Sequence, residues 1–169
     1  MALSVQAFCD WLAATPLSLL IQNTAWIIPT VQSIHIMAIT VVIGAAAMTN
    51  LKMLGVIGRG QPTAAYVGRF LPWIWPTLAV LLATGAILII AEPGRSLQNQ
   101  SFIRKMILLV LAMAVTAATQ IPVGKDAGFW ESTSARKMAG RVLGVLALCM
   151  WTGIVFAGRW IAYTNAAGS

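Results

Sequence analysis

Four long apolar segments constrain the fold of this chain more than any other feature of its sequence. They cover residues 26–54, 72–91, 102–120 and 137–163. A helix needs about 20 mainly apolar residues to cross a membrane, because the hydrocarbon layer is about 30 Å thick and each residue rises about 1.5 Å. The sequence therefore predicts an all-α membrane protein with four transmembrane helices in an antiparallel bundle.

The composition agrees with this prediction and excludes several classes of soluble protein. Hydrophobic residues make up 59% of the chain and charged residues only 9%, whereas a soluble domain has about 25% charged residues. So few charges cannot cover a surface that faces water. This excludes a cytoplasmic enzyme, a disordered chain and a free nucleic-acid-binding domain, despite the net charge of +7. The expected partners include membrane lipids but not nucleic acid.

Residues 3–14 precede the first apolar segment and have a different pattern. Apolar residues recur there at helical spacing, and polar residues lie between them. This pattern predicts a short amphipathic helix in the membrane interface, ended by Thr15 and Pro16. A weaker signal of the same kind covers residues 62–70, in the loop after the first span.

The Lys and Arg residues are divided unevenly between the two predicted sides of the membrane. Four belong to the side that carries both termini: Arg95, Arg104, Lys105 and Arg159. The other seven of the 11 belong to the opposite side: Lys52, Arg59, Arg69, Lys125, Arg136, Lys137 and Arg141. Loops rich in Lys and Arg stay in the cytoplasm. We therefore expect a bacterial inner-membrane protein with both termini in the periplasm.

The only histidine, His35, lies about 13 Å along the first span from Trp26. It belongs to a semi-polar stripe, because eight residues point within about 60° of one direction when each residue turns the helix by about 100°. The stripe consists of Gln32, His35, Ile39, Val42, Ala46, Thr49, Asn50 and Met53. Such a stripe is unfavourable against lipid, so we expect it to face the bundle interior or a partner subunit.

Several roles for His35 are compatible with this position. The simplest is a neutral imidazole that is hydrogen-bonded to Gln32 or to a neighbouring helix. The alternatives are an axial ligand of a haem b iron, a hydrogen-bond partner of a quinone, and a proton-relay group. A single histidine cannot ligate haem iron twice. A haem would therefore need a methionine, a second protomer or an open sixth position.

Charged residues gather where three of the spans reach the predicted outer side. Glu92 follows the second span, Arg104 and Lys105 begin the third, and Arg159 lies about one turn inside the end of the fourth. We expect Glu92 to pair with Arg159 or Arg104. These groups either anchor the helix ends, with one structural salt bridge, or form an outward-opening anion pocket above His35. The anion would be a haem propionate, a lipid headgroup or a carboxylate substrate.

Trp151 lies near the middle of the fourth span, and we expect it to pack between helices or to line a pocket. Other tryptophans lie near predicted helix ends, where an amphipathic ring is favoured: Trp26, Trp73, Trp75 and Trp160.

Small residues occur in several spans and favour close packing of helices in a membrane. They include the stretches 44–47 and 83–86 and the pair Gly140 and Gly144. Both cysteines, Cys9 and Cys149, are expected to be small buried apolar residues without a disulfide between them.

Five motifs follow a common pattern: Trp26-Ile27-Ile28-Pro29, His35, Leu51-Lys52-Met53-Leu54-Gly55, Phe102-Ile103-Arg104-Lys105-Met106 and Gly158-Arg159-Trp160-Ile161-Ala162-Tyr163. In these five motifs the chain resembles a family of small four-helix bacterial inner-membrane proteins of unknown function. The resemblance spans nearly the whole chain, supports the topology and directs attention to His35, Glu92 and Arg159, but implies no activity. Gln32 and Asn50 stand where the pattern leads us to expect acidic residues, and no histidine follows the third span.

Three functions fit these features. The first is an integral-membrane subunit that anchors or assembles a membrane complex or homo-oligomer without catalysis of its own, since short loops in 169 residues leave no room for a soluble catalytic domain. The second is a redox subunit of cytochrome b or quinone-binding type. Its candidate cofactor-binding residues are His35, Gln32, Arg159, Arg104, Glu92 and Trp151, with His35 as the metal ligand.

The third function is a small oligomeric channel or carrier, whose path would follow Gln32, His35, Thr49 and Asn50. Four helices enclose little volume, so a pore would require oligomerisation. The chain has no phosphate-binding loop, dinucleotide fingerprint, Cys-x-x-Cys or His-Glu-x-x-His motif, and we do not expect it to be an enzyme.

Overall fold

The computed structural model describes residues 2–164, and the side chains of residues 5–160. Every element in this range is a helix: α1 (Ala2–Ala13), α2 (Pro16–Asn23), α3 (Ile27–Met53), α4 (Thr63–Ala91), α5 (Pro93–Leu97), α6 (Gln100–Lys125) and α7 (Ser134–Thr164). Helices α3, α4, α6 and α7 are long and apolar enough to cross a membrane. The predicted all-α fold with four such helices is confirmed.

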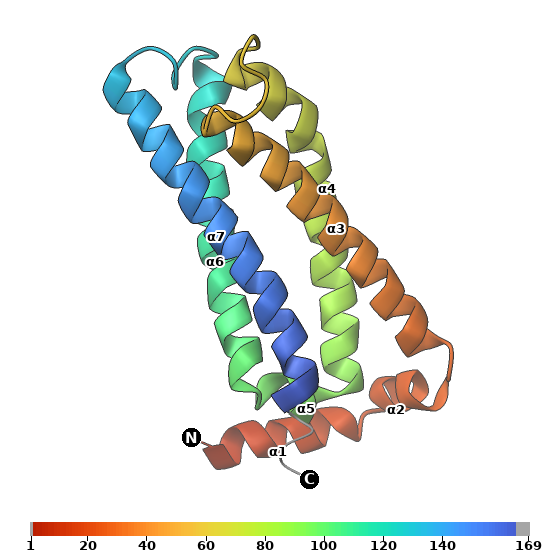
Figure 1. Ribbon diagram of the computed structural model, residues 1–169. Helices are drawn as coiled ribbons and strands as arrows, with labels where there is room; N and C mark the ends of the chain where they lie inside the picture. Colours follow the sequence, from red (N-terminus) through yellow and green to blue (C-terminus); the bar gives the residue numbers. More distant parts are fainter. Residues whose placement is uncertain (1, 165–169) are drawn as a thin grey trace.

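The four long helices form an antiparallel bundle of two hairpins (Figure 1). Helix α3 packs along α4, α6 packs along α7, and α3 also packs against α7 of the other hairpin. Helices α4 and α6 touch over a much shorter stretch. We call the end that carries α1, α2 and α5 the foot, and the end that carries the loops 54–62 and 126–133 the head.

Three short helices cover the foot. Helix α1 runs across the ends of the long helices and contacts α5, while α2 contacts α4. The Thr15 side chain caps α2 by accepting a hydrogen bond from the Ser18 backbone N–H, and Pro16 occupies the first turn. The buried Ser18 hydroxyl donates to the Ile90 carbonyl at 2.6 Å, which ties α2 to the end of α4.

The predicted stripe of α3 faces the bundle interior along most of its length. Its buried members are Val42, Ala46, Thr49, Asn50 and Met53. His35 and Ile39 are partly buried, whereas Gln32, nearest the foot, is exposed. The helical spacing therefore predicted the inward face of α3 correctly from His35 onward.

Small residues allow α3 and α7 to approach closely, as the sequence predicts. Gly140 and Gly144 of α7 are buried. A Cβ atom added at Gly144 would lie 3.3 Å from the Asn50 carbonyl oxygen, and one added at Gly140 would lie 3.1 Å from Met53 Cε. Side chains rarely make contacts this short. The two helices thus pack almost backbone to backbone, which is a common arrangement between membrane helices.

Helix α4 begins at Thr63, earlier than the predicted start at residue 72. The weak amphipathic signal over residues 62–70 is the first part of this helix and not a separate interfacial one. Pro72 and Pro76 lie inside α4. Each removes the hydrogen bond of its own nitrogen and crowds the carbonyl four residues earlier, but packing keeps the helix intact. Trp73 and Trp75 consequently lie well inside α4, so their predicted position near a helix end was wrong.

Two further features differ from the expectations. The N-terminal helix ends near Thr15 as predicted, but a second short helix, α2, follows it without a signal in the apolar spacing. Cys9 is buried, whereas Cys149 lies on the exposed face of α7, so its predicted burial was wrong. Both cysteines are free.

Candidate functional site

The side chain of His35 on α3 is hydrogen-bonded across the bundle to Thr84 on α4. The Nδ1 to Oγ1 distance is 2.7 Å, and Thr84 is buried while His35 is partly buried. Of the two predicted partners, Gln32 and a neighbouring helix, the structure selects the neighbouring helix. Its hydroxyl comes from the segment 83–86, which the sequence marked only as a packing surface.

The surroundings of Thr84 determine which atom of this pair donates. A hydroxyl has a single proton, and Thr84 Oγ1 lies 2.7 Å from the Val80 carbonyl oxygen and 3.2 Å from that of Leu81. The Thr84 proton is therefore directed at the backbone of its own helix. Nδ1–H of His35 donates to Oγ1, and a neutral ring then carries its free lone pair on Nε2.

Lys105 of α6 lies in the foot-side half of the bundle, as His35 does on α3. Its aliphatic chain passes Gly158 of α7, where an added Cβ would lie 3.9 Å from Lys105 Cδ and 4.0 Å from Nζ. The Lys105 side chain is partly buried. We call His35, Thr84, Lys105 and Gly158 the His35 layer, because these residues pair α3 with α4 and α6 with α7 in the foot-side half of the bundle.

The His35 layer is rich in basic groups and poor in acidic ones. Within residues 5–160, the only salt bridge joins Arg95 to Glu92, so no carboxylate pairs with Lys105. Ionisable groups are costly inside a membrane and are functional candidates wherever they occur. The layer offers a hydrogen-bond acceptor at His35 Nε2 and donors at Lys105 Nζ, a combination that suits a ligand with carbonyl or hydroxyl oxygens.

Glycine beside the imidazole leaves space for the ring. A Cβ added at Gly85 would lie 3.6 Å from His35 Cε1, which is an ordinary contact distance. The ring thus lies directly over the backbone of α4 next to Thr84. A larger side chain at this position would meet the ring with its outer atoms, so Gly85 helps to set how closely α3 and α4 approach.

The predicted ion pair of Glu92 was wrong. Its carboxylate pairs with Arg95 at 2.8 Å, three residues along the chain in the short helix α5, and not with Arg104 or Arg159 as predicted. The sequence pattern could not identify this partner, because it did not predict that residues 93–97 form a helical turn. Both side chains are partly exposed, and such a pair contributes little to stability.

The remaining foot-end candidates have exposed side chains. Gln32 is exposed on α3. Arg104 is also exposed, and its Nη2 lies 3.4 Å from Gln100 Oε1 on the same helix. Arg104 and Trp160 line a shallow pocket between α6 and α7, together with Ser101, Phe156 and Ala157. Arg159 is exposed near the end of α7.

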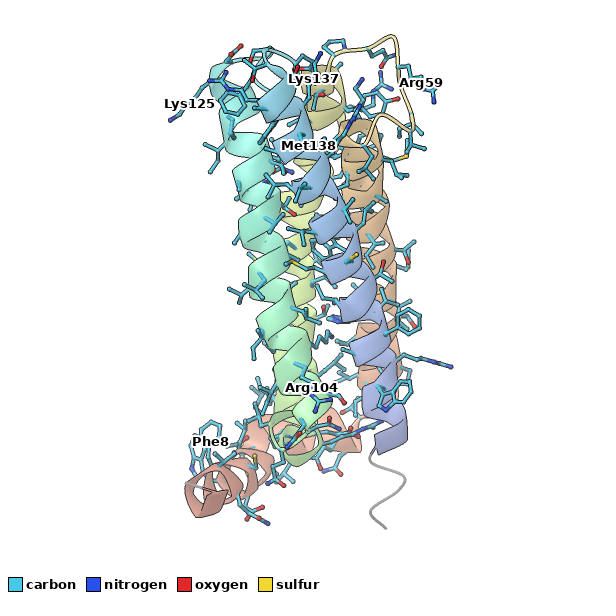
Figure 2. All side chains as sticks on the ribbon, turned by 60° about the vertical axis from the view of Figure 1, so that its left-hand side comes forward. Phe8, Arg59, Arg104, Lys125, Lys137 and Met138 are labelled. Carbon is cyan, nitrogen blue, oxygen red and sulfur yellow. The ribbon has the colours of Figure 1, made fainter. Side chains whose placement is uncertain are left out.

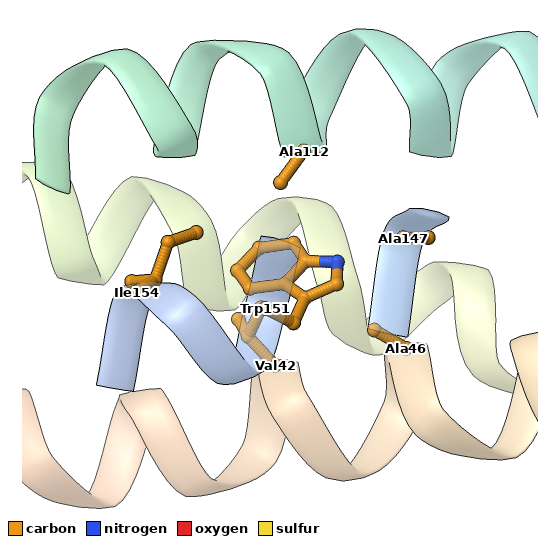
Figure 3. Close-up of a cluster of buried hydrophobic side chains, with 6 residues drawn as sticks. All are labelled: Val42, Ala46, Ala112, Ala147, Trp151 and Ile154. Atoms are coloured by element: carbon orange, nitrogen blue, oxygen red, sulfur yellow. The ribbon is translucent and has the colours of Figure 1, made fainter. Parts of the chain in front are cut away.

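Trp151 packs between helices, as one of its two predicted placements stated. It is 4% exposed and lies among Val42, Ala46, Ala112, Ala147 and Ile154 at the centre of the bundle (Figure 3). Its Nε1 atom has no hydrogen-bond partner. The apolar cluster around Trp151 therefore separates the His35 layer from the polar groups near the head.

Several interior polar groups were not singled out from the sequence. Thr116 Oγ1 and Gln120 Oε1 of α6 are buried without hydrogen-bond partners. Lys105 was interpreted as a helix-end cation, although the apolar residues that follow it already favour a position inside the span. Within the described part of the chain, no three His, Cys, Asp or Glu side chains are grouped so that they could hold a metal ion.

Comparison with known proteins identifies a family. The model of the family of unknown function DUF6644 matches residues 8–164, nearly the whole chain. The chain therefore belongs to this family, which agrees with the resemblance to an uncharacterised family of four-helix membrane proteins. No curated protein and no solved structure gives a match.

Proposed function

We propose that this member of the DUF6644 family is an integral-membrane subunit that assembles with copies of itself or with other membrane proteins, without catalytic activity of its own. The observation that carries the proposal is an exposed face of small residues on α4. Its members recur every three or four residues along the helix: Ala79, Ala83 and Ala86. This spacing places them on one side of α4.

The exposure of this α4 face is what supports association. Lipid tails are as apolar as leucine, so membrane helices associate mainly through close packing of small residues. Several small residues of α3 and α7 are buried inside the chain, as at Ala46 and Gly144. Those of the α4 face are exposed, and α4 packs only briefly against α6. A second helix packed on this face would complete the same kind of contact.

Size-increasing substitutions on α4 test the association. We expect Ala83→Leu to reduce the oligomeric fraction of the purified chain several-fold in native mass spectrometry, because the larger side chain keeps a second backbone away. Ala114→Leu is the matched control, since Ala114 is also exposed but lies on α6 beside Val110 and Leu111. A parent protein that is monomeric and captures no membrane partner would contradict the proposal.

The proposal includes a location and an orientation. Seven of the 11 Lys and Arg residues belong to the head, which favours a cytoplasmic head under the rule that positive loops stay inside. The foot, with α1 and the end of α7, would then face the periplasm of a bacterial inner membrane. Phe8 and Trp11 of α1 are exposed, and their ring centroids lie 5.8 Å apart. Exposed aromatic rings suit a helix lying in the membrane interface.

The His35 layer supports a second candidate function, the binding of a quinone headgroup. The Thr84 hydrogen bond fixes the imidazole through Nδ1, which leaves Nε2 to accept a hydrogen bond from a quinol hydroxyl. Lys105 would donate to a quinone carbonyl. This donor set suits a quinone better than a haem, because the chain has one histidine and iron ligated on both faces would need a methionine or another protomer.

Solvent extraction of the purified protein tests this second candidate. We expect a co-purified quinone to be present in the parent and reduced at least several-fold in His35→Ala, with no change in Thr40→Val, whose hydroxyl bonds only to its own helix at Ile36. A Soret absorption band lost in His35→Ala would instead support haem. A preparation free of both groups would eliminate this candidate and leave the assembly proposal untouched.

A channel through a single chain receives less support. The cluster around Trp151 fills the centre of the bundle between the His35 layer and the buried Thr49 and Asn50 near the head. A path that follows the polar stripe of α3 would have to pass this apolar cluster. Transport would therefore require a pathway between chains rather than within one.

A further inference from the structure

A small pocket opens at the head, at the opposite end of the bundle from the His35 layer. Its walls come from the end of α3, the beginning of α4, the loop 126–133 and the beginning of α7. Its volume is about 140 Å³, well below the roughly 300–1,000 Å³ of pockets that enclose drug-sized ligands. The pocket is therefore suited to a single small group and not to a haem or a nucleotide.

Trp130 lines this pocket and is held by contacts on several sides. Trp130 is buried, its Nε1–H donates to the Thr119 carbonyl at 2.9 Å, and its ring packs edge to face against Phe129. Gly140 of α7 lies against the ring, since an added Cβ would lie 3.1 Å from Trp130 Cε3. A side chain at position 140 would therefore crowd the indole in this pocket.

The one carboxylate in the pocket is already engaged. Glu131 Oε1 accepts hydrogen bonds from the Thr63 hydroxyl and from the Thr63 backbone N–H, the latter at 2.9 Å. Thr63 is the first residue of α4, and a carboxylate is favoured at a helix N-terminus by the helix dipole. The negative charge of Glu131 therefore serves to cap α4.

Three cations line the same pocket as this engaged carboxylate. The Lys52 ammonium donates to the carbonyls of Gly58, at 2.8 Å, and Gln61, so one of its three donors is left. Lys137 and Arg141 stand four residues apart on α7 and therefore on one face. In the part of the chain whose side chains are described, none of the three forms a salt bridge, because the one ion pair there is Arg95 with Glu92.

We propose that this pocket binds a phosphate group through Lys52, Lys137 and Arg141. Ammonium and guanidinium groups hold phosphate oxygens through charge-assisted hydrogen bonds, and a bound anion would relieve the repulsion between Lys137 and Arg141. Pockets of basic residues between membrane helices bind the headgroups of anionic lipids. The pocket lies where four apolar helices reach their head-side ends, so a phospholipid phosphate is the favoured source over soluble phosphate.

Native mass spectrometry of the full chain, with added phosphatidylglycerol or phosphatidylcholine, tests the proposal. We expect the parent to retain phosphatidylglycerol preferentially, and the double variant Lys137→Gln/Arg141→Gln to bind it about tenfold more weakly. The matched control is Arg69→Gln/Lys125→Gln, which also removes two positive charges from the head but leaves the pocket intact. Figure 2 shows Lys125 projecting away from the bundle, apart from Lys137.

A second measurement separates the two sources of phosphate. Inorganic phosphate is added to the delipidated parent and to the pocket variant in detergent, and the melting temperature of each is recorded. If phosphate raises the melting temperature of the parent alone and both proteins bind lipid equally, the pocket is a phosphate site whose ligand is soluble. Equal loss of lipid in both double variants, or no binding of either ligand by the parent, would overturn the proposal.

Discussion

Glu131, in the loop between α6 and α7, caps the first turn of α4 by accepting hydrogen bonds from both the backbone N–H and the hydroxyl of Thr63. The residue before Thr63 is Pro62, which has no side-chain hydrogen bond to offer. A residue 68 positions away in the sequence therefore supplies the cap. This contact joins the two helical hairpins at the head.

Glu131→Ala should destabilise the protein by about 1–2 kcal/mol, because it leaves the first turn of α4 without its cap. Glu131→Gln should cost less, since the amide oxygen still accepts a hydrogen bond. Unfolding in detergent followed by circular dichroism measures both variants. The control is Glu92→Ala, which breaks only the exposed pair with Arg95 and should cost about 0–1 kcal/mol. Equal losses at Glu131 and Glu92 would contradict the capping role.

Thr84→Val should release the His35 ring. It removes the acceptor of the Nδ1–H bond, so we expect a loss of about 1 kcal/mol in stability and a changed tautomer distribution in ¹⁵N NMR of the imidazole. Thr40→Val loses only a hydroxyl bond within its own helix and should leave the imidazole signals unchanged. Identical imidazole spectra in parent and Thr84→Val would mean that the hydrogen bond does not hold the ring.

Trp151→Ala should be the most destabilising of the substitutions considered. It would open a cavity among Val42, Ala112 and Ile154, and removal of a buried tryptophan costs about 3–5 kcal/mol. Trp151→Phe should cost clearly less, because the indole N–H that it removes has no partner. Denaturant titration of both variants tests the order. A phenylalanine variant as unstable as the alanine variant would indicate an unrecognised role for the N–H group.

Gly144→Ala should push α3 and α7 apart. The new Cβ would lie 3.3 Å from the Asn50 carbonyl oxygen, a backbone atom that cannot move aside alone, so we expect a loss of about 1–3 kcal/mol. Gly44→Ala is the control, since nothing lies within 4 Å of the added atom, and alanine is a better helix former than glycine. Thermal unfolding compares the stability of the two variants. A Gly144→Ala variant as stable as the parent would refute tight α3–α7 packing.

Single cysteines at the two ends of the bundle should reveal its orientation. In a background with Cys9→Ala and Cys149→Ala, we expect Gln98→Cys at the foot to react with a membrane-impermeant maleimide added to intact cells. Ala127→Cys at the head should react only after the membrane is opened. Both introduced positions are exposed, so access depends on the side of the membrane. The reverse pattern would invert the proposed topology.

Much of the fold could be predicted because apolar length and helical spacing act locally. Twenty or more apolar residues and a 3.6-residue period were enough to identify four helices and the inward face of α3. The continuation of α4 through residues 63–71 could not be predicted. Prolines at 72 and 76 favour a break when the sequence is considered alone, whereas packing of Val67 and Ile74 against neighbours holds one continuous helix.

The site was less predictable than the fold, because partners between helices depend on rotation and depth. The position of His35 in the sequence indicated an interior ring, yet nothing in the spacing distinguished Thr84 from Gln32 as its partner. The pairing of Glu92 with Arg95 required knowledge that residues 93–97 form a helical turn. The head pocket combines residues from four separate segments, so only the tertiary structure brings its charges together.

The apolar cluster around Trp151 affects how a membrane potential would be distributed along the bundle. A voltage falls mainly across the least polarisable part of its path, and here that part is the apolar layer between His35 and the head. Most of the potential difference between the His35 imidazole and the Lys137 ammonium would then fall across this apolar layer.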